Sequence, residues 1–460
     1  MIITGTIKQE NKKWWLAYIA TMVLPWALIF NRSIADICCI IIGVLFLCQS
    51  YSNKNWNWLK SPFVKVGLLA WAWLMLVVSP LALVPEESFG VAVPWIRYII
   101  LFAALQYWLL VKPEPLLLLV KILAVMVGFV VIDTLWQYLY DMSLSGNMRY
   151  DSGRLTGPMD NVKVGIFIAK MSLPTAGICL FFSLHKKQYL WMVFTIFLII
   201  ASEAIILLSG ERTAFVSSMI GLFSMIFLLA MTERKMRIAV PFLIILFTAL
   251  SFFMIKTQDW VLFRAVTFRD TVLTFGESVY GKLFKAANII GTDNWLSGAG
   301  LKGFRILCEP IEYAQYKFCN TYAYCNLHPH NTYLEWFSEA GGIGLLLYST
   351  MVIILLVTSL RYFRANSGIY RLLPAVAFGT VFINFFPIMV TQSIFSNWPA
   401  ILLWYCVAVS FSALNLCKTG IRKDYCHPAG HEVSAQDLSI IAKDPVLLLR
   451  NPQDDRGGRD

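Results

Sequence analysis

Long apolar runs, repeated along the whole chain, limit most strongly how this sequence can fold. Helices of roughly 17–25 apolar residues are long enough to cross a bilayer. By that criterion the 460 residues contain about twelve such runs. We expect them near 14–31, 33–50, 66–84, 91–110, 116–139, 162–184, 189–208, 213–231, 238–256, 340–360, 373–391 and 397–417. The sequence therefore predicts an all-α, polytopic integral membrane protein.

Composition agrees with that class of fold. The chain is 58% hydrophobic and only 14% charged, whereas soluble domains carry about a quarter charged residues. A net charge of +11 would suggest nucleic-acid binding in a soluble protein. Here the basic residues lie in short loops between apolar runs, where membrane orientation accounts for them. We therefore expect no nucleic-acid partner. The first apolar run lacks a small-residue cleavage site and is expected to remain as a helix.

The loops alternate in positive charge. Basic residues gather in the N-terminal tail, in every second loop and at the start of the C-terminal tail. That alternation predicts that both termini are cytoplasmic, and it places segments 140–161, 208–213 and 257–339 on the outer face. In a bacterial inner membrane this face is the periplasm. The expected divisions are helices in 1–256, a long outer loop in 257–339, helices in 340–417 and a mobile cytoplasmic tail in 418–460.

The outer loop from Thr257 to His330 is far longer than a typical connection, and ordered loops of this length are often functional. Within it, segment 278–290 has apolar residues at helical spacing, with Lys282 and Lys285 on the opposite edge. Such a helix would rest on lipid headgroups or close over an anionic lipid substrate.

Three cysteines follow in the same loop, and an oxidising compartment permits a disulfide between them. A Cys308–Cys325 pair would staple the segment before the histidines, but Cys319 is an equal candidate. A zinc site formed by these cysteines and His328 matches no compact metal motif, so we expect no metal.

Two further polar segments lie on the predicted outer face. Arg212 stands at the outer end of a membrane helix, where an arginine usually faces a cavity or a partner. The alternative is an interfacial anchor or an ion pair with Glu211. Segment 140–161 is polar and rich in turn residues, and on its own it predicts a solvated loop.

Only two of the five histidines, His328 and His330, lie on the predicted outer face. The residues from Thr332 to Glu335 fit a capping box with Thr332 as N-cap, so a helix should start directly after the histidines. Its free amides and positive dipole end would suit phosphate oxygens. Gly341, Gly342 and Gly344 would permit close packing or a kink. Alternatively, the histidines only cap a loop at the interface.

His330-Asn331, nine residues and then Gly341-Gly342-Ile343-Gly344 resemble the H-N-x9-G-x-x-G signature of the bacterial O-antigen ligase and polymerase-like family. The stretches Gly210-Glu211-Arg212-Thr213-Ala214, Arg154-Leu155-Thr156-Gly157-Pro158, and Leu296-Ser297-Gly298-Ala299-Gly300 with Phe304 are also similar to that family, in the same order. The resemblance implies a GT-C-like, metal-independent and cofactor-free glycosyltransferase. Such an enzyme transfers a glycan from undecaprenyl pyrophosphate with inversion at the anomeric carbon.

The resemblance also implies roles for single residues. His330 matches the motif histidine, which as a neutral imidazole could accept the proton of the acceptor hydroxyl. Arg212 matches the motif arginine, which would hold the pyrophosphate and stabilise the charge that develops on it. The further substrate-binding candidates are Arg154, Lys282, Arg264, Arg269, His328, Asn331 and Glu335, and the structural candidates are Gly341, Gly344, Cys308 and Cys325.

One departure from the family pattern concerns the second phosphate ligand. Family members usually have an arginine shortly before an aromatic-alanine stretch like Phe284-Lys285-Ala286-Ala287. This chain offers Tyr280, Gly281 and Lys282 there. Lys282 could substitute as a point charge, or Arg264 or Arg269 could reach the site.

The acceptor separates the alternatives within the family. A ligase uses a hydroxyl of the lipid A core oligosaccharide, and a polymerase uses another lipid-linked repeat. The general architecture and the single long loop favour a ligase embedded in the lipids of a bacterial inner membrane. A polysaccharide lipid transporter or flippase is the alternative from another class. It would show charged residues near mid-membrane and inverted repeats with broken helices, and the sequence shows neither clearly.

Overall fold

The computed structural model describes residues 12–150, 153–234, 273–307 and 328–424, with single positions 237, 241, 245 and 248 between them. These described residues are mainly helical and contain no β-strand. They include 10 helices that are long and apolar enough to cross a membrane, and the shorter apolar helix Pro62–Val78. The predicted span at 238–256 lies largely outside the described residues. The prediction of an all-α polytopic membrane protein is confirmed.

The helices before the long loop are α1 (Lys12–Phe30), α2 (Arg32–Ser52), α3 (Pro62–Trp73), α4 (Pro85–Ala104), α5 (Pro113–Tyr140), α6 (Val164–His185), α7 (Tyr189–Leu208) and α8 (Arg212–Ala230). A π-helical turn extends α3 through Leu74–Val78 and another extends α4 through Leu105–Leu109. The later helices are α11 (Val279–Asp293), α12 (Gly303–Leu307), α14 (Thr332–Ala365), α15 (Leu372–Phe385) and α16 (Asn397–Asp424). Short 3-10 turns cover Asn57–Lys60, Phe275–Glu277 and Gly368–Arg371.

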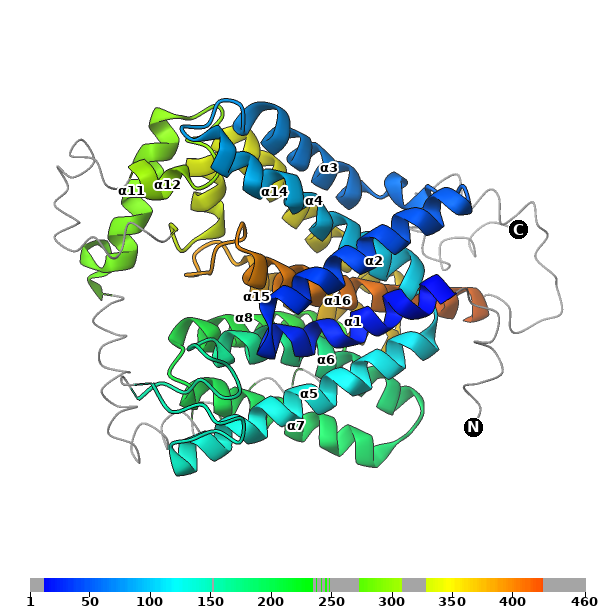
Figure 1. Ribbon diagram of the computed structural model, residues 1–460. Helices are drawn as coiled ribbons and strands as arrows, with labels where there is room; N and C mark the ends of the chain where they lie inside the picture. The colour runs from blue at the N-terminus through cyan, green and yellow to red at the C-terminus, as the bar shows by residue number, and fades with distance from the viewer. Residues whose placement is uncertain are drawn as a thin grey trace, which may run out of the picture.

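Helices α6 and α16 form the centre of the bundle, where nearly all their side chains are buried. In a bilayer there is no water to satisfy backbone amides, so the hydrogen bonds stay within the helices. Small residues then allow close helix packing. At the crossing of α8 and α15, a Cβ on Gly221 would lie 2.9 Å from the Gly379 carbonyl oxygen. The described chain begins and ends at one side of the bundle, opposite α11 and α12 (Figure 1).

Helix α14 consists of two helical segments that meet at Gly341. This residue has φ 72° and ψ −175°, a backbone conformation that is essentially restricted to glycine. The segment before α12 binds the kink through its backbone. The Trp295 carbonyl accepts from Gly342 N at 2.6 Å, and Ala299 N donates to Ser338 O at 2.9 Å. The kink that the glycines were expected to permit is present, and it anchors the loop that carries α11 and α12.

Helix α11 confirms the amphipathic helix predicted at 278–290. Its apolar residues Leu283, Ala287 and Ile290 are buried against Phe304 of α12. This face therefore packs on protein. The two roles expected of the helix, on lipid headgroups or over an anionic lipid substrate, stay predictions. Ser278 caps the helix by accepting from Gly281 N at 3.1 Å.

Helix α15 ends at Phe385, whereas the apolar pattern predicted a helix to residue 391. Pro387 accounts for the difference, because a proline has no N–H to donate and disfavours helical backbone at the residue before it. Residues 386–396 instead form a non-helical loop that returns to the start of α14. We call it the α15–α16 loop.

Candidate functional site

The start of α14 has an unusual backbone. His330 has φ 57°, in the left-handed region. That conformation costs roughly 1–2 kcal/mol for a residue with a side chain. It turns the His330 carbonyl toward the α15–α16 loop, where Thr391 N donates to it at 2.6 Å. Such conformations persist where surrounding contacts enforce them, and they cluster at functional sites.

Asn331 caps α14 and holds the α15–α16 loop at the same time. Its Oδ1 accepts from Tyr333 N at 3.0 Å and from Leu334 N at 3.1 Å. Its Nδ2 donates to the carbonyls of Pro387 at 2.6 Å and Met389 at 3.2 Å. The N-cap is therefore Asn331, and the capping box predicted with Thr332 as N-cap is wrong.

Glu335 completes the attachment of the α15–α16 loop. Its carboxylate accepts from the Ser393 hydroxyl and from Ile394 N, the latter at 3.0 Å. The side chain thus reaches across to the loop and does not fold back on its own helix, as a capping box would require. Asn331 and Glu335 are both buried and use these polar atoms within the protein. Their geometry therefore suits positioning of the histidines better than direct substrate contact.

The rings of His328 and His330 lie together, with centroids 4.2 Å apart. Tyr280 of α11 meets His330 edge-on, with centroids 5.4 Å apart. His328 Nε2 lies 3.2 Å from the Thr391 carbonyl oxygen. Because a carbonyl only accepts, we infer that this nitrogen carries the proton in the neutral ring.

Burial keeps both imidazoles neutral. It lowers the pKa of His328 to about 3, and the nearby His330 and Arg305 contribute in the same direction. Burial also lowers the pKa of His330, while contact with the Thr391 backbone opposes the shift. A neutral imidazole has a lone pair that can accept a proton. His330 is therefore in the protonation state that a general base requires.

Arg212 begins α8 and lies within electrostatic range of both Arg154 and Tyr280. Tyr280 in turn touches His330, so the two motif residues are brought to one region of the molecule. Among the described residues, no carboxylate lies within ion-pair distance of Arg212. Its charge is therefore available to an anionic ligand.

Glu211 does not neutralise its neighbour. Its carboxylate accepts from Gly165 N at 2.6 Å and from Ile166 N at 3.2 Å, at the start of α6. Burial raises the pKa of Glu211, while these hydrogen bonds and the charges of Arg154 and Lys163 oppose the shift. The ion pair between Arg212 and Glu211, which was one interpretation of Arg212, is absent. The Glu211 carboxylate instead accepts hydrogen bonds from the first amides of α6.

The loop that carries Arg154 is packed into the protein. Thr156 N and Gly157 N both donate to Gln137 Oε1 at 2.9 Å, and residues 155–159 are buried. The expectation of a solvated loop therefore holds for most of 140–150 and at Asp160 and Asn161, but it is wrong for residues 155–159. Gln137 was the sequence feature that could have indicated this packing. It is a polar residue within an apolar run, and its side chain anchors the loop.

The remaining predicted site residues divide into two groups. Lys282 is half-buried on α11, two residues after Tyr280. Arg264, Arg269, Cys308, Cys319 and Cys325 lie outside the described residues. Sequence reasoning assigned no role to Tyr280 and none to the α15–α16 loop. The sequence features that could have indicated them were an aromatic residue outside the apolar face of α11, for Tyr280, and a polar run after Pro387, for the α15–α16 loop.

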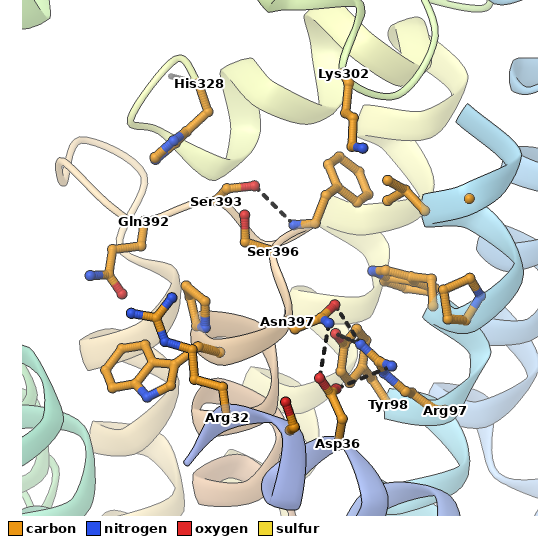
Figure 2. A pocket seen from close by; sticks show the side chains of 18 of the residues that line it. Arg32, Asp36, Arg97, Tyr98, Lys302, His328, Gln392, Ser393, Ser396 and Asn397 are labelled. Carbon is orange, nitrogen blue, oxygen red and sulfur yellow. Dashed lines mark hydrogen bonds and ion pairs between the residues drawn. The ribbon is translucent and has the colours of Figure 1, made fainter. Parts of the chain in front are cut away.

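A cavity of about 810 Å³ opens beside His328 (Figure 2). Its walls come from α2, α4, the residue before α6, the segment around α12, the α15–α16 loop and the start of α16. Its basic lining residues are Arg32, Arg97, Lys163, Lys302 and Arg305. Neither Arg212 nor Tyr280 is among the lining residues, so the cavity reaches the histidine pair from the His328 side.

Part of the chain matches a known protein family. The family model described as O-antigen ligase matches residues 195–349. This range runs from α7 past the kink in α14, and it includes Arg212, Tyr280 and His330. No curated protein sequence matches the chain.

Proposed function

We propose, from the match of residues 195–349 to the O-antigen ligase family model, that the protein is a membrane glycosyltransferase of the ligase type. It moves a glycan from undecaprenyl pyrophosphate to a hydroxyl of the lipid A core oligosaccharide. The observation that carries the proposal is the convergence of His330, Tyr280 and Arg212 from three distant segments. A half-buried, neutral base beside uncompensated positive charge suits a reaction that removes a proton and releases a pyrophosphate.

The proposed reaction is a single displacement. His330 accepts the proton of the acceptor hydroxyl, and the hydroxyl oxygen forms a bond to the anomeric carbon of the donor glycan. The bond from that carbon to the pyrophosphate oxygen breaks, and undecaprenyl pyrophosphate leaves with the bonding electrons. Attack opposite the leaving group inverts the anomeric configuration. Because the donor already carries a good leaving group, the step needs positioning and charge stabilisation.

Arg212 is the proposed main ligand of the leaving pyrophosphate, since a guanidinium presents several donors to phosphate oxygens. Arg154 is its proposed partner, because the two side chains lie within electrostatic range of each other. Lys282 is the further candidate on α11, near Tyr280. Arg264 and Arg269 stay candidates from the sequence alone.

We also propose that this site faces the periplasm from a bacterial inner membrane, with both termini in the cytoplasm. The alternation of positive charge in the loops supports that orientation. Helix α11, which carries Tyr280, and the described ends of the chain lie at opposite sides of the bundle, which is consistent with it.

Buried charges inside the membrane helices also favour an interfacial enzyme over a transporter. Asp133, Lys170 and Glu203 are all largely buried. Each lies within about two turns of the helix end nearest the Arg154–Arg212 region. Transporter sites lie near the bilayer midplane.

Deletion of the gene in its host distinguishes a ligase from a polymerase that uses the same donor. We expect that full-length polymer accumulates on its lipid carrier and that none is attached to the lipid A core. Lipopolysaccharide that carries at most one repeat would instead identify a polymerase. A matched strain with the wild-type gene restored is the control.

A further inference from the structure

The cavity beside His328 has a strongly basic lining. Its one acidic lining residue, Asp36, is already paired: Arg97 Nη1 lies 3.2 Å from its carboxylate and Asn397 Nδ2 donates to it at 3.0 Å (Figure 2). Lys302 lies 3.8 Å from Glu87. Among the described residues, no carboxylate lies within ion-pair distance of Arg32, Lys163 or Arg305. The cavity therefore carries a net positive charge.

Two of these cations are close to each other. Burial lowers the pKa of Lys163, and the charge of Arg32 lowers it further, with Glu211 opposing. Lys163 Nζ also lies 5.2 Å from the centroid of the Trp398 ring. Like charges held this close repel, and an anion bound between them would relieve the repulsion.

Two helix N-termini add to the positive potential. α2 begins at Arg32 and α16 begins at Asn397, and both residues line the cavity. The start of a long helix carries a partial positive charge, which favours phosphate groups. At α2 this contribution is the dipole, because Asn31 Oδ1 already accepts from Ser33 N and Ile34 N.

The lining also contains buried polar atoms without a partner among the described residues. They include the indole Nε1 of Trp95, a residue that is 1% exposed, and Oε1 of Gln392. Such atoms are costly unless a ligand or water binds them. The lining thus offers hydrogen-bonding groups suited to sugar hydroxyls as well as charge suited to phosphate.

The position of the cavity decides which substrate it takes. His328 lines the cavity and lies against His330, while Arg212 lies beyond Tyr280 and outside the lining. In an inverting displacement the acceptor approaches opposite the leaving group. We propose that this cavity is the acceptor site and that it binds a phosphorylated glycan acceptor through Arg32, Lys163 and Arg305. This inference rests on the proposed function.

Two acceptors carry the required chemistry. One is a core oligosaccharide with phosphate substituents, and the other is a second lipid-linked glycan with its own pyrophosphate. The shared feature is a phosphate group within reach of the cavity while the acceptor hydroxyl lies at His330.

The test compares the purified full-length protein with its Arg32→Gln and Arg305→Gln variants in lipid nanodiscs. Transfer is measured against the concentration of each acceptor and of the donor. Loss of one charged hydrogen bond should raise the acceptor KM roughly 10- to 100-fold. The donor KM should stay within about twofold if Arg212 binds the donor elsewhere. The acceptor whose KM rises identifies the source of the phosphate.

Arg149→Gln is the matched control. Arg149 carries the same charge near the predicted outer loop but lies outside the cavity, and it is already paired with Asp141 at 3.2 Å. Its variant should leave the acceptor KM unchanged. Removing the phosphates from the acceptor should raise the wild-type KM and abolish the difference between wild type and the cavity variants.

A readout without catalysis separates this inference from the proposed function. Binding of the phosphorylated core oligosaccharide and of the lipid-linked glycan is measured on protein that also carries His330→Asn. Weaker binding of the core oligosaccharide by the cavity variants supports the site, even if wild-type protein transfers no glycan. Weaker binding of the lipid-linked glycan supports it when the protein also carries Arg212→Gln, which removes the proposed donor site. Unchanged acceptor binding and KM, or an increase confined to the donor KM, would overturn it.

Discussion

At His330, contacts with Thr391 affect both the backbone conformation and the pKa of the imidazole. The Thr391 carbonyl accepts from His328 Nε2, and the Thr391 amide donates to the carbonyl of His330, whose backbone is left-handed. The Thr391 backbone also contacts the His330 ring. Burial then keeps the imidazole neutral. A residue in this conformation tolerates few replacements, and asparagine is one of them. That tolerance makes it possible to remove the base without disturbing the turn.

We predict that His330→Asn retains the fold and loses transfer by roughly 10²- to 10⁴-fold, the usual contribution of a general base. Its melting temperature should stay near that of wild type, because asparagine readily adopts positive φ. Transfer is measured with purified protein, and folding is followed by thermal unfolding. Transfer within a few-fold of wild type would show that His330 is not the base.

The lowered pKa of His330 predicts where activity fails in acid. The base is active when neutral, so kcat/KM should hold as the pH falls past about 6.5, the ordinary pKa of histidine, and decline only below it. Folding stability should also fall as the pH drops below about 6.5, because the unfolded chain takes up the proton first. An acid limb centred at or above pH 6.5 would contradict a lowered pKa of His330.

At the scale of elements, the kink of α14 connects the long loop to the membrane bundle. Gly341 faces the Leu296 carbonyl so closely that a Cβ would lie 2.2 Å from its oxygen. The same segment also binds the start of α4, where Leu301 N donates to Ser88 Oγ at 3.1 Å. The loop that carries Tyr280 is therefore fixed at two places.

Gly341→Ala should lower the melting temperature and reduce transfer. An alanine there would have to adopt a backbone conformation that is essentially restricted to glycine, which costs roughly 1–3 kcal/mol of folding free energy. Its methyl group would also displace the Leu296 carbonyl. Gly128→Ala in α5 is the control, because a Cβ there meets nothing within 4 Å. It should be neutral or slightly stabilising. Equal effects of the two variants would count against the role given to the kink.

Element by element, the sequence was most informative where a pattern is local. Apolar runs predicted the long helices, and the period of 278–290 predicted α11. The end of α15 was missed because the apolar run continues past Pro387, and only the contacts of Asn331 and Glu335 show where that loop goes. Helical periodicity could not predict that Tyr280 contacts His330 or that Arg154 lies within electrostatic range of Arg212, because these pairs join distant segments.

At the scale of the whole molecule, the bundle has two chemically different ends. The described termini lie at one end, and the helices α11 and α12 of the long loop lie at the other (Figure 1). Tyr280 of α11 contacts His330. This division is what an enzyme needs when its substrates are anchored in one leaflet.

Reporter fusions test that arrangement. Green fluorescent protein fused after Asp460 should fluoresce, because it folds in the cytoplasm, and alkaline phosphatase fused at Ser145 should be active, because it needs the periplasm. Fusions at Lys187 serve as the control and should behave like the C-terminal ones. The reverse pattern would place the site on the cytoplasmic face.

The central claim is that His330 and Arg212 transfer a glycan from undecaprenyl pyrophosphate without a metal. The most direct measurement follows undecaprenyl pyrophosphate released by purified protein that is given lipid-linked glycan, acceptor and EDTA. We predict that wild-type protein releases the lipid in step with product, and that His330→Asn and Arg212→Gln release almost none. Dependence on added metal, or full release by both variants, would contradict the account.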